Sequence, residues 1–490
     1  MKPSSLSDQV VYRKKGRIVS PLVDELEDVL KLNSWSLERV PEYLWLALIL
    51  DKYGRTQGLQ YCSDIIRFIT KNFPEINSAK ISDILHADTA VQIKIFEKIN
   101  TLIDPKVLSP LTVVIDNSMS KTFYNQFYIA AYSMGDRAEK LKEVTKKYNS
   151  PDSFEATDVR YLAVLPKVFF GNLTFTEDGL DITAMKNYST TTHDEEIMAL
   201  YRPVVRTIEG VQMPDDKIDD FVSLFWKRVM AVTDCKPMAI SFKKETNKQK
   251  YFKFIENTKE AINYLNVKSK EKTLLDDAYS VLIGSLAYAF KTFIEVIEHD
   301  LGNTIIGRQS IRIIIEIYIM MKYLCLKEAE KPEIWKEYKA YGIGKYKLIL
   351  LKVRAGMGND ISHITEPLLN AIVNEPMLEE FTDIDLKYFD DIKIRDKAMS
   401  IGEKDLYDVA YDYDSSYAHG LWGAVRESSM LSCGNVFHHY HAIPDATATQ
   451  NLSDVTEDCY KYLVKLIKFV NQKYNLSKWY MEYLEEVHDE

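Results

Sequence analysis

Turn-forming residues are scarce in this sequence. Its 490 residues include only 18 glycines and 15 prolines, while the hydrophobic fraction of 46% and the charged fraction of 27% are ordinary for a globular protein. This composition disfavours an all-β fold, which needs frequent tight turns. Because a single hydrophobic core stops growing near about 250–300 residues, we expect a mainly α protein. It would have two helical domains, with at most minor β structure in the N-terminal part.

Cysteines are also few, and their arrangement argues against two common uses. They are odd in number, far apart in the sequence, and form no Cys-x-x-Cys pair: Cys62, Cys235, Cys325, Cys433 and Cys459. Neither a zinc ribbon nor a complete disulfide framework fits this pattern. We therefore expect reduced thiols buried in the core.

No segment has the composition of a secretion signal or of a membrane span. The first 16 residues are polar and basic, and no apolar stretch follows them. The most hydrophobic runs, 44–50 and 311–321, are shorter than the ~20 residues of a membrane helix. The net charge of −10 disfavours broad, non-specific binding of nucleic acid, although it leaves room for a local basic cleft. These features predict a cytoplasmic protein without a membrane partner.

Helical periodicity divides the chain into three parts. We expect an N-terminal helical module over 20–240, a Lys-rich connecting segment over 241–273, and a C-terminal helical bundle over 274–480. The first periodic stretch begins near Pro21, and the stretch 158–170 fits either a helix or a strand. In the N-terminal part, helices are expected over 42–52, 57–72, 89–101, 118–148, 193–210 and 216–232, with a loop or short hairpin between 171 and 188. In the C-terminal part, they are expected over 274–299, 305–327, 335–353, 405–426 and 451–475, with an acidic loop over 375–391.

The helix expected over 305–327 carries a line of charge in apolar surroundings. Arg308, Arg312 and Glu316, which we call the Arg–Glu seam, follow one another at four-residue spacing and so share one side of the helix. Buried charge is costly unless it is paired. One interpretation is that Glu316 pairs with Arg312 and fixes the helix register. The other is that an arginine faces a cleft and binds an anion with its planar guanidinium.

The segment 411–426 is the natural companion of the Arg–Glu seam. As a helix it would place Ser415 or Ser416 on one side together with His419 and Arg426. Histidine is the side chain best suited to move protons near neutral pH. The candidate catalytic residues are therefore Arg308, Arg312, Ser416 and His419, and the candidate binding residues are Glu316, Tyr413 and Arg426.

Histidines cluster once more, close to a cysteine. The imidazoles of His438, His439 and His441 suit zinc, copper or iron, but adjacent histidines on an irregular segment do not converge on one ion. Cys433 and His438 could act as nucleophile and base, yet nothing in the sequence lowers the pKa of that thiol. We predict neither a metal site nor a cofactor.

Two charged sets in the N-terminal half repeat the pattern of arginines and acids at short spacing. Asp158 and Arg160 form one set, and Arg202, Arg206 and Glu209 form the other. Both lie beside apolar residues, where charges are retained when they are paired. We predict structural ion pairs.

The C-terminal pattern resembles a family of bacterial proteins known mainly as a domain of unknown function. Its members show an Arg-x3-Arg-x3-Glu helix, as in the Arg–Glu seam, followed by a Ser-x-x-His element, as in Ser416 and His419. The resemblance covers roughly residues 274–475. Segments that look like an accompanying module of longer relatives are 41–45, 158–160 and 202–206.

More distantly, an arginine and a histidine on the helices of a small bundle are similar to the HEPN superfamily. Many of its members are metal-independent ribonucleases that act as dimeric toxins or antiphage effectors. The resemblance implies that an arginine would stabilise the scissile phosphate and that His419 would do acid–base work. In the HEPN signature the arginine precedes the histidine by four to six residues. This sequence has no such pair, so a site here would have to combine two helices.

These observations leave two hypotheses. The first, which we favour from the resemblance, is an RNA-directed effector that holds or cleaves RNA at the Arg–Glu seam and His419. It predicts seam residues that are partly accessible and lie in basic surroundings. The second is a non-enzymatic sensor or scaffold that binds a partner protein or a small anionic ligand, with a purely structural seam. It predicts an exposed apolar patch or groove elsewhere. A homodimer is compatible with both.

Overall fold

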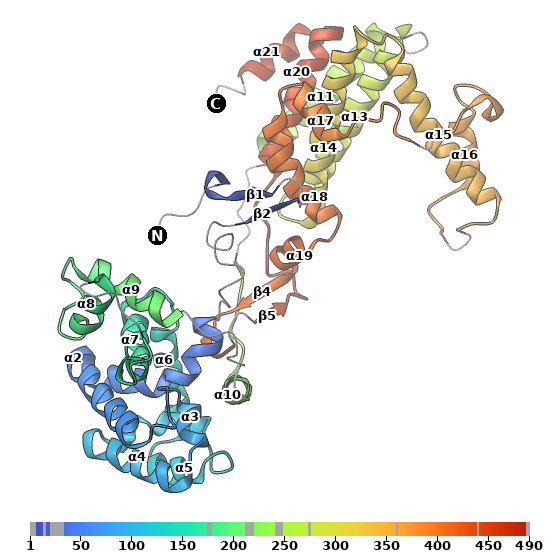
Figure 1. The fold of residues 1–490 in the computed structure, drawn as a ribbon. Coiled ribbons are helices and arrows are strands. Elements are labelled where there is room, and N and C mark those ends of the chain that lie inside the picture. The colour runs from blue at the N-terminus through green and yellow to red at the C-terminus, as the bar shows by residue number, and fades with distance from the viewer. Residues whose placement is uncertain are drawn as a thin grey trace. The chain divides into compact units, whose positions relative to one another are not determined.

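The protein is mainly α-helical, as expected, in a computed structural model (Figure 1). The structure describes residues 6–12, 16–19, 34–173, 179–210, 220–240, 248–272, 276–358, 361–385, 387–438 and 441–486. The chain forms two units. Unit 1 comprises Met1–Pro237 and Cys433–His441, and unit 2 comprises Met238–Ser432 and Ala442–Glu490. The chain therefore passes between the units three times.

Unit 1 is helical, with one short antiparallel strand pair near its start. The strands are β1 (Val10–Tyr12) and β2 (Arg17–Val19). The longer helices are α2 (Val40–Asn72), α4 (Thr89–Leu102), α6 (Met134–Tyr148), α7 (Phe154–Phe169), α9 (Met198–Gly210) and α10 (Asp220–Ala231). The shorter ones are α3 (Ile81–His86), α5 (Lys121–Phe127), α8 (Leu180–Asn187), η1 (Leu6–Asp8), η3 (Trp35–Arg39), η4 (Pro105–Val107), η5 (Ser109–Val113) and η8 (Val436–His438). The periodic stretch that begins near Pro21 lies outside the described residues.

Helices α2 and α7 pack against each other in the core of unit 1. Pro41 occupies the first turn of α2, where its missing N–H removes no helical hydrogen bond, and Trp45 is fully buried. Gly54 has a φ of 74°, which glycine adopts without strain, and it kinks α2 there. The helices expected over 42–52 and 57–72 are thus two parts of one kinked helix. The stretch 158–170, which fits either a helix or a strand by sequence, lies almost entirely in the helix α7.

Two expectations for unit 1 are wrong. The stretch 118–148 is not one helix, because Ser120 and Ser133 each cap a new helix by accepting a hydrogen bond from the N–H three residues on. The proposed hairpin fails at its second strand, because residues 180–187 form the helix α8. The remaining part of that hairpin, 174–178, lies outside the described residues.

The buried acids Asp158 and Glu209 of unit 1 pair with arginines on other helices rather than with their sequence neighbours. The carboxylate of Glu209 lies 2.9 Å from Arg39 and 3.5 Å from Arg160, and burial raises its pKa. The carboxylate of Asp158 accepts a hydrogen bond of 3.0 Å from Arg55. These pairs connect η3, α2, α7 and α9, so they act as architecture.

Unit 2 is a helical bundle with short strands that belong to a small three-stranded sheet. The long helices are α11 (Gln249–Lys268), α13 (Asp277–Glu298), α14 (Ile305–Glu328), α15 (Ile334–Arg354) and α20 (Thr456–Tyr474). The shorter ones are α16 (Glu366–Val373), η6 (Glu379–Phe381), α17 (Ile394–Ser400), η7 (Leu406–Tyr411), α18 (Asp412–Ala418), α19 (Trp422–Ser429) and α21 (Lys478–Glu486). β4 (Met430–Cys433) pairs antiparallel with β5 (Ala442–Pro444), with Leu431 opposite Ile443. Both β4 and the two-residue strand β3 (Pro237–Met238) span a boundary between the units.

Helices α13, α14 and α20 pack against one another in the core of unit 2. Among the described residues, α13 is the one helix long and apolar enough, by length and composition, to cross a membrane, so the expectation that no segment has such a composition is wrong for it. In this structure its buried side chains, including Phe290 and Phe293, belong to the core. α11 lies within the Lys-rich segment and buries Tyr251, Phe254 and Ile255 in the same core.

The expected helix over 405–426 is interrupted once, at residues 419–421. η7 continues into α18, which ends at His419 because Gly420 follows with a φ of 59°, a left-handed conformation that favours glycine. The chain becomes helical again at Trp422, where α19 begins. A single continuous helix was therefore a wrong expectation, and the interruption decides where His419 lies.

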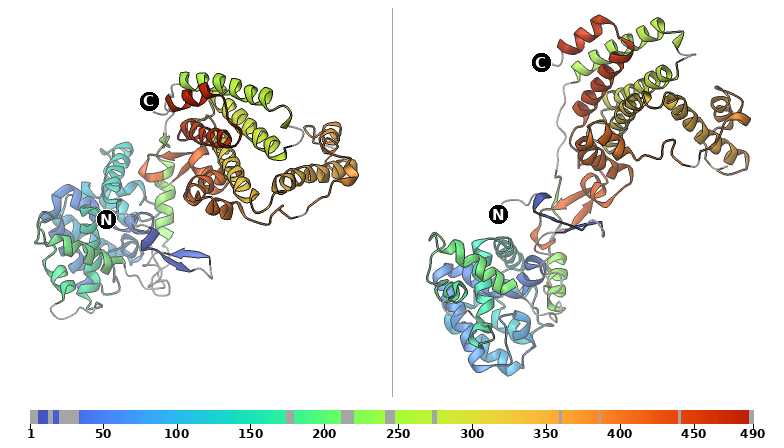
Figure 2. Two further views of the ribbon diagram at one scale, coloured as in Figure 1. Left: turned by 90° about the horizontal axis from the view of Figure 1, so that it is seen from above. Right: turned by 45° about the horizontal axis from the view of Figure 1, so that its top comes forward.

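The C-terminal part of α15, together with α16, extends away from the other helices of unit 2 (Figures 1 and 2). The acidic stretch 375–391 contains the short helix η6, and its backbone lies against α15. A Cβ on Gly344 would lie 2.6 Å from the carbonyl oxygen of Asp383, so glycine permits this close approach. Lys347 secures it by donating to the carbonyl oxygens of Glu379 and Thr382.

Candidate functional site

The Arg–Glu seam lies on α14, where it faces α18 and η7 of the same unit. Thr304 caps α14 by accepting a hydrogen bond from the Gly307 N–H, and from there the four-residue spacing places the three charges in one line. The side chain of Arg308 is 9% exposed, whereas those of Arg312 and Glu316 are 24% and 40% exposed. The seam therefore runs from the core toward solvent.

Arg312 is held by three groups. Its Nε donates to Ser415 Oγ at 3.0 Å and its Nη2 donates to the Tyr411 hydroxyl at 2.8 Å. That hydroxyl in turn donates to Glu316 Oε2 at 2.9 Å, and Glu316 lies 3.4 Å from Arg312. Burial, and next the charge of Glu316, raise the pKa of Tyr411, so the phenol stays a donor. The four side chains form a closed polar network across three elements, α14, η7 and α18.

Arg308 makes a different and less complete set of contacts. Its guanidinium lies 3.6 Å from Asp414 Oδ1, an ion pair without a hydrogen bond, and it lies over the rings of Tyr413 and Tyr417 at 5.2 and 5.7 Å. Arg308 Nε and Asp414 Oδ1 are buried without hydrogen-bond partners among the described residues. Burial raises the pKa of Asp414 to about 6, although Arg308 acts in the opposite direction. This carboxyl therefore titrates near neutral pH.

The two tyrosines beside Arg308 converge on a second acid. The hydroxyls of Tyr413 and Tyr417 donate to Glu427 at 2.7 and 2.6 Å. Arg426, one residue earlier on α19, points to other partners. It donates to the carbonyl oxygen of Met430 and to Ser432 Oγ, at 2.9 and 2.8 Å, and so holds the end of α19 to β4.

The remaining candidates lie away from this network. Ser416 Oγ donates to the carbonyl of Tyr413 at 2.7 Å, within its own helix, and it is Ser415 that reaches Arg312. His419 is exposed, and among the described residues no hydrogen bond joins its ring to Arg308 or Arg312, which pair with other groups. The structure thus brings Arg308, Arg312, Glu316 and Tyr413 to one interface, but not Ser416, His419 or Arg426.

Several residues of this interface were not singled out from the sequence: Tyr411, Asp414, Ser415 as the serine that contacts Arg312, Tyr417 and Glu427. The signal that could have found two of them is spacing, because Tyr411 and Ser415 are four residues apart, as are Arg312 and Glu316. Two such pairs on packed helices can interlock. Chemically, the arrangement can hold an anion near the accessible part of Arg312, and the carboxylate beside that arginine is the partly exposed one of Glu316.

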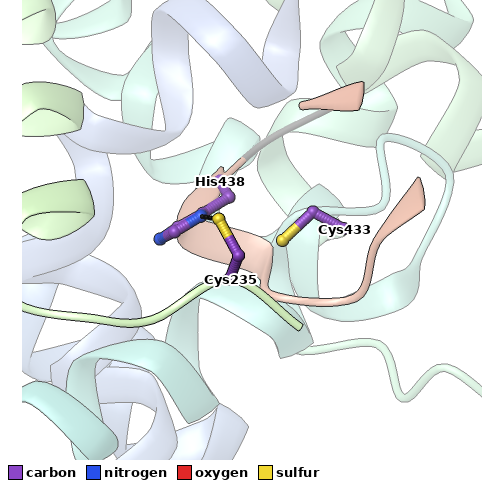
Figure 3. Close-up of side chains that lie close together, drawn as sticks. All are labelled: Cys235, Cys433 and His438. Atoms are coloured by element: carbon purple, nitrogen blue, oxygen red, sulfur yellow. Dashed lines mark hydrogen bonds between the residues drawn. The ribbon is translucent and has the colours of Figure 1, made fainter. Parts of the chain in front are cut away.

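A second cluster lies in unit 1, at the segment 433–441. The Sγ atoms of Cys235 and Cys433 and a ring nitrogen of His438 all lie within 4.8 Å of one another (Figure 3). Cys235 is exposed, so the expectation of five core thiols is wrong for it. The spacing from Cys433 to His438 was visible in the sequence, but Cys235 is 203 residues from His438 and no sequence pattern links them.

The fold and the Arg–Glu seam define a helical bundle with an internal polar network. Residues 279–435 of this chain match the model of a family of unknown function (DUF5677). The matched segment contains the whole seam together with Ser416 and His419, which confirms the resemblance of the C-terminal half to a domain of unknown function. No curated protein and no solved structure matches the chain. The more distant similarity to the HEPN superfamily stays a prediction.

Proposed function

We propose that this protein is a non-enzymatic helical scaffold that binds a partner protein through α15 and α16 of unit 2. The observation that carries this proposal is an open, largely apolar hollow of about 390 Å³. It is lined by Ile349, Lys352, Val353, Met357, Gly358, Ile361 and Ile364. Hollows of this size and composition are typical of binding sites.

The apolar side chains around this hollow are unusually accessible. Among the residues that line it, Met357 is 60% exposed, Ile361 is 44% exposed and Ile349 is 37% exposed. Each exposed Å² of apolar surface costs about 25 cal/mol relative to burial. Gathered exposed apolar side chains therefore point to a surface that a partner covers.

The lining also specifies the partner's chemistry. Among the seven lining residues Lys352 is the one charged side chain, it is exposed, and no ion pair to it is present among the described residues. An apolar helix face of another protein, with a carboxylate next to its apolar side chains, would fill the hollow and pair with Lys352.

If the protein is a scaffold, the Arg–Glu seam has a structural role. Arg312 uses its hydrogen bonds on Tyr411 and Ser415 and its charge on Glu316. Acid–base catalysis would use the His419 imidazole, and among the described residues no hydrogen bond joins that ring to either arginine of the seam. The seam then serves to lock α14 onto η7 and α18.

The test begins with a photo-crosslinking residue at Met357 in the full-length chain, expressed in its own host. The matched control carries it at Tyr288, which is 59% exposed on α13 of the same unit. A protein crosslinked from Met357 and not from Tyr288 is then purified, and its affinity for the full-length chain is measured by calorimetry.

We expect Met357→Asp and Lys352→Glu each to weaken that affinity at least tenfold. Lys336→Glu, at a 68% exposed side chain near the other end of α15, should leave it unchanged. If no protein is specific to Met357, or if the purified protein binds both variants as tightly as the wild type, the proposal is wrong. Binding of a small apolar molecule alone would also contradict it.

One observation favours the RNA-directed effector as a second candidate. Arg312 Nη1 has no hydrogen-bond partner among the described residues, and it is not among their buried polar atoms. It can therefore reach a phosphate. If the seam binds RNA, Arg312→Ala should weaken binding of single-stranded RNA. If it also cleaves RNA, His419→Ala should abolish cleavage. Unchanged binding in Arg312→Ala would exclude this function.

A further inference from the structure

We propose that unit 1 contains a Zn²⁺ site whose ligands are Cys235, Cys433, His438 and His441. All four residues belong to unit 1, so the site is complete within it. It is independent of the hollow on unit 2 and of the partner proposed there.

The first three ligand atoms lie close to the separation that a tetrahedral ion requires, so small side-chain adjustments bring them onto one ion. Zn²⁺ binds thiolate sulfur at about 2.3 Å and imidazole nitrogen at about 2.0 Å, so two such ligands of one ion lie roughly 3.5–3.8 Å apart. Cys235 Sγ lies 3.2 Å from His438 Nδ1, and the whole set lies within 4.8 Å. Figure 3 shows the side chains of Cys235 and Cys433 converging beside the imidazole.

The surroundings of His438 orient its ring as in a metal site. Its Nε2 lies 3.2 Å from the carbonyl oxygen of Thr233 and 3.1 Å from that residue's hydroxyl. A ring N–H that donates to a carbonyl fixes the tautomer with the lone pair on the other nitrogen, which is the usual arrangement of a metal-binding histidine. Nδ1 therefore presents its lone pair toward the two sulfur atoms.

Backbone contacts position Cys433 in the same way. The N–H of Lys236, the residue after Cys235, donates to Cys433 Sγ at 3.4 Å. The N–H of Gly434 donates back to the carbonyl of Lys236 at 2.8 Å. A donor aimed at sulfur stabilises a thiolate, which is the form that binds zinc.

The segment that carries three of the ligands is itself anchored. Phe437, which lies between Cys433 and His438 in the sequence, is fully buried in the core of unit 1. Asn435 donates to the carbonyl of Asp234 at 3.0 Å and accepts from the Phe437 N–H at 3.1 Å. Cys433 and His438 are thus held before any ion binds, which limits the ordering cost of binding.

His441 is placed to supply the fourth ligand. Its N–H donates to the carbonyl of His438 at 2.7 Å, and its carbonyl accepts from the Cys433 N–H at 3.2 Å. The ring centroids of the two histidines lie 6.0 Å apart. Two imidazoles on one tetrahedral zinc would have centroids roughly 5 Å apart, so a side-chain rotation of His441 completes the set. Two sulfurs and two imidazoles select zinc over magnesium or calcium, which prefer oxygen ligands.

The test measures metal in the full-length protein, purified under reducing conditions without chelators from cells supplied with Zn²⁺. We expect one zinc per chain by plasma mass spectrometry. Substitution by Co²⁺ should give the visible absorption of a tetrahedral cobalt–thiolate site. Cys433→Ser and His438→Ala should each weaken Zn²⁺ affinity at least 100-fold. His438→Cys, which restores a ligand, should bind again. His441→Ala should weaken affinity at least tenfold.

Cys325→Ser is the matched control, because Cys325 is a partly buried thiol that is not part of the cluster. It should keep both the zinc and the cobalt spectrum, and circular dichroism checks that each variant is folded. Zinc content that is the same in Cys433→Ser, His438→Ala and the wild type would overturn the proposal. So would protein that holds a Cys235–Cys433 disulfide and binds no Zn²⁺ after reduction. Unchanged affinity in His441→Ala would remove His441 from the ligand set.

Discussion

At the scale of single residues, the buried pair of Arg308 and Asp414 gives the protein a measurable pH dependence. Burial raises the pKa of Asp414 to about 6, above its ordinary value of 3.8. The folded state therefore binds the proton more tightly than the unfolded state between these two values. The contribution of protonated Asp414 to the free energy of unfolding is present below pH 4 and is lost as the pH rises through 6.

The first prediction concerns Asp414→Asn, which has no proton to lose. Each pKa unit is worth about 1.4 kcal/mol, so from pH 4 to pH 7 the variant should gain up to about 3 kcal/mol relative to the wild type. Thermal unfolding of the full-length chain across that range measures the difference. A constant difference between the two proteins would show that Asp414 titrates normally.

The second prediction concerns the hydroxyl of Tyr411, which both accepts from Arg312 and donates to Glu316. Tyr411→Phe removes both hydrogen bonds and leaves two charged groups without this partner. We expect a loss of about 2–3 kcal/mol of unfolding free energy, as for hydrogen bonds to charged groups. Tyr288→Phe, at a 59% exposed position, should change it by less than about 0.5 kcal/mol. Urea unfolding compares the two, and equal effects would contradict a structural network.

At the scale of secondary structure, α15 contains two glycines with different surroundings. A Cβ at Gly342 would meet nothing within 4 Å, whereas one at Gly344 would collide with the backbone of Asp383. The third prediction is therefore a pair of opposite effects. Gly342→Ala should stabilise α15 by about 0.5–1 kcal/mol, and Gly344→Ala should displace the segment around η6. Hydrogen exchange should be faster at 379–385 in the second variant alone. Equal exchange there in both variants would show that the close approach is dispensable.

The bounds of a helix could be predicted from the sequence where the spacing of its apolar residues is regular. The helix α4 has almost the expected bounds, 89–102 against 89–101, because its apolar spacing is regular and its ends carry no competing signal. The region 405–426 was less predictable. Its apolar and aromatic residues suggest one helix, whereas the left-handed φ of Gly420 is a property of the folded backbone that spacing does not reveal.

In the candidate site, too, the residues set by local spacing could be predicted, whereas those set by packing could not. The line of Arg308, Arg312 and Glu316 is a consequence of helical geometry alone and could be predicted. Its partners Tyr411 and Asp414 depend on how α14 packs against η7 and α18, which one sequence does not specify. Cys235 was unpredictable for a stronger reason, since the contact it makes with His438 spans 203 residues.

At the scale of the whole molecule, unit 1 is completed by a segment from near the end of the chain. Phe437 is fully buried in the core of unit 1, and η8 packs against α6 and α10. The fourth prediction is that Phe437→Ala destabilises unit 1 by about 3–5 kcal/mol, as for a large aromatic removed from a core. Hydrogen exchange should increase in α6 and α10 and stay unchanged in α13 and α14. Phe252→Ala, at a 47% exposed position, is the control.

The late arrival of 433–441 also has a consequence for synthesis on the ribosome. The residues up to Pro237 emerge first, yet the core of unit 1 lacks Phe437 until about 200 further residues have been translated. At about 5–20 residues per second this takes roughly 10–40 s. During that interval an incomplete core is exposed to chaperones and proteases, so the abundance of this protein in the cell should depend on them more than its final stability would suggest.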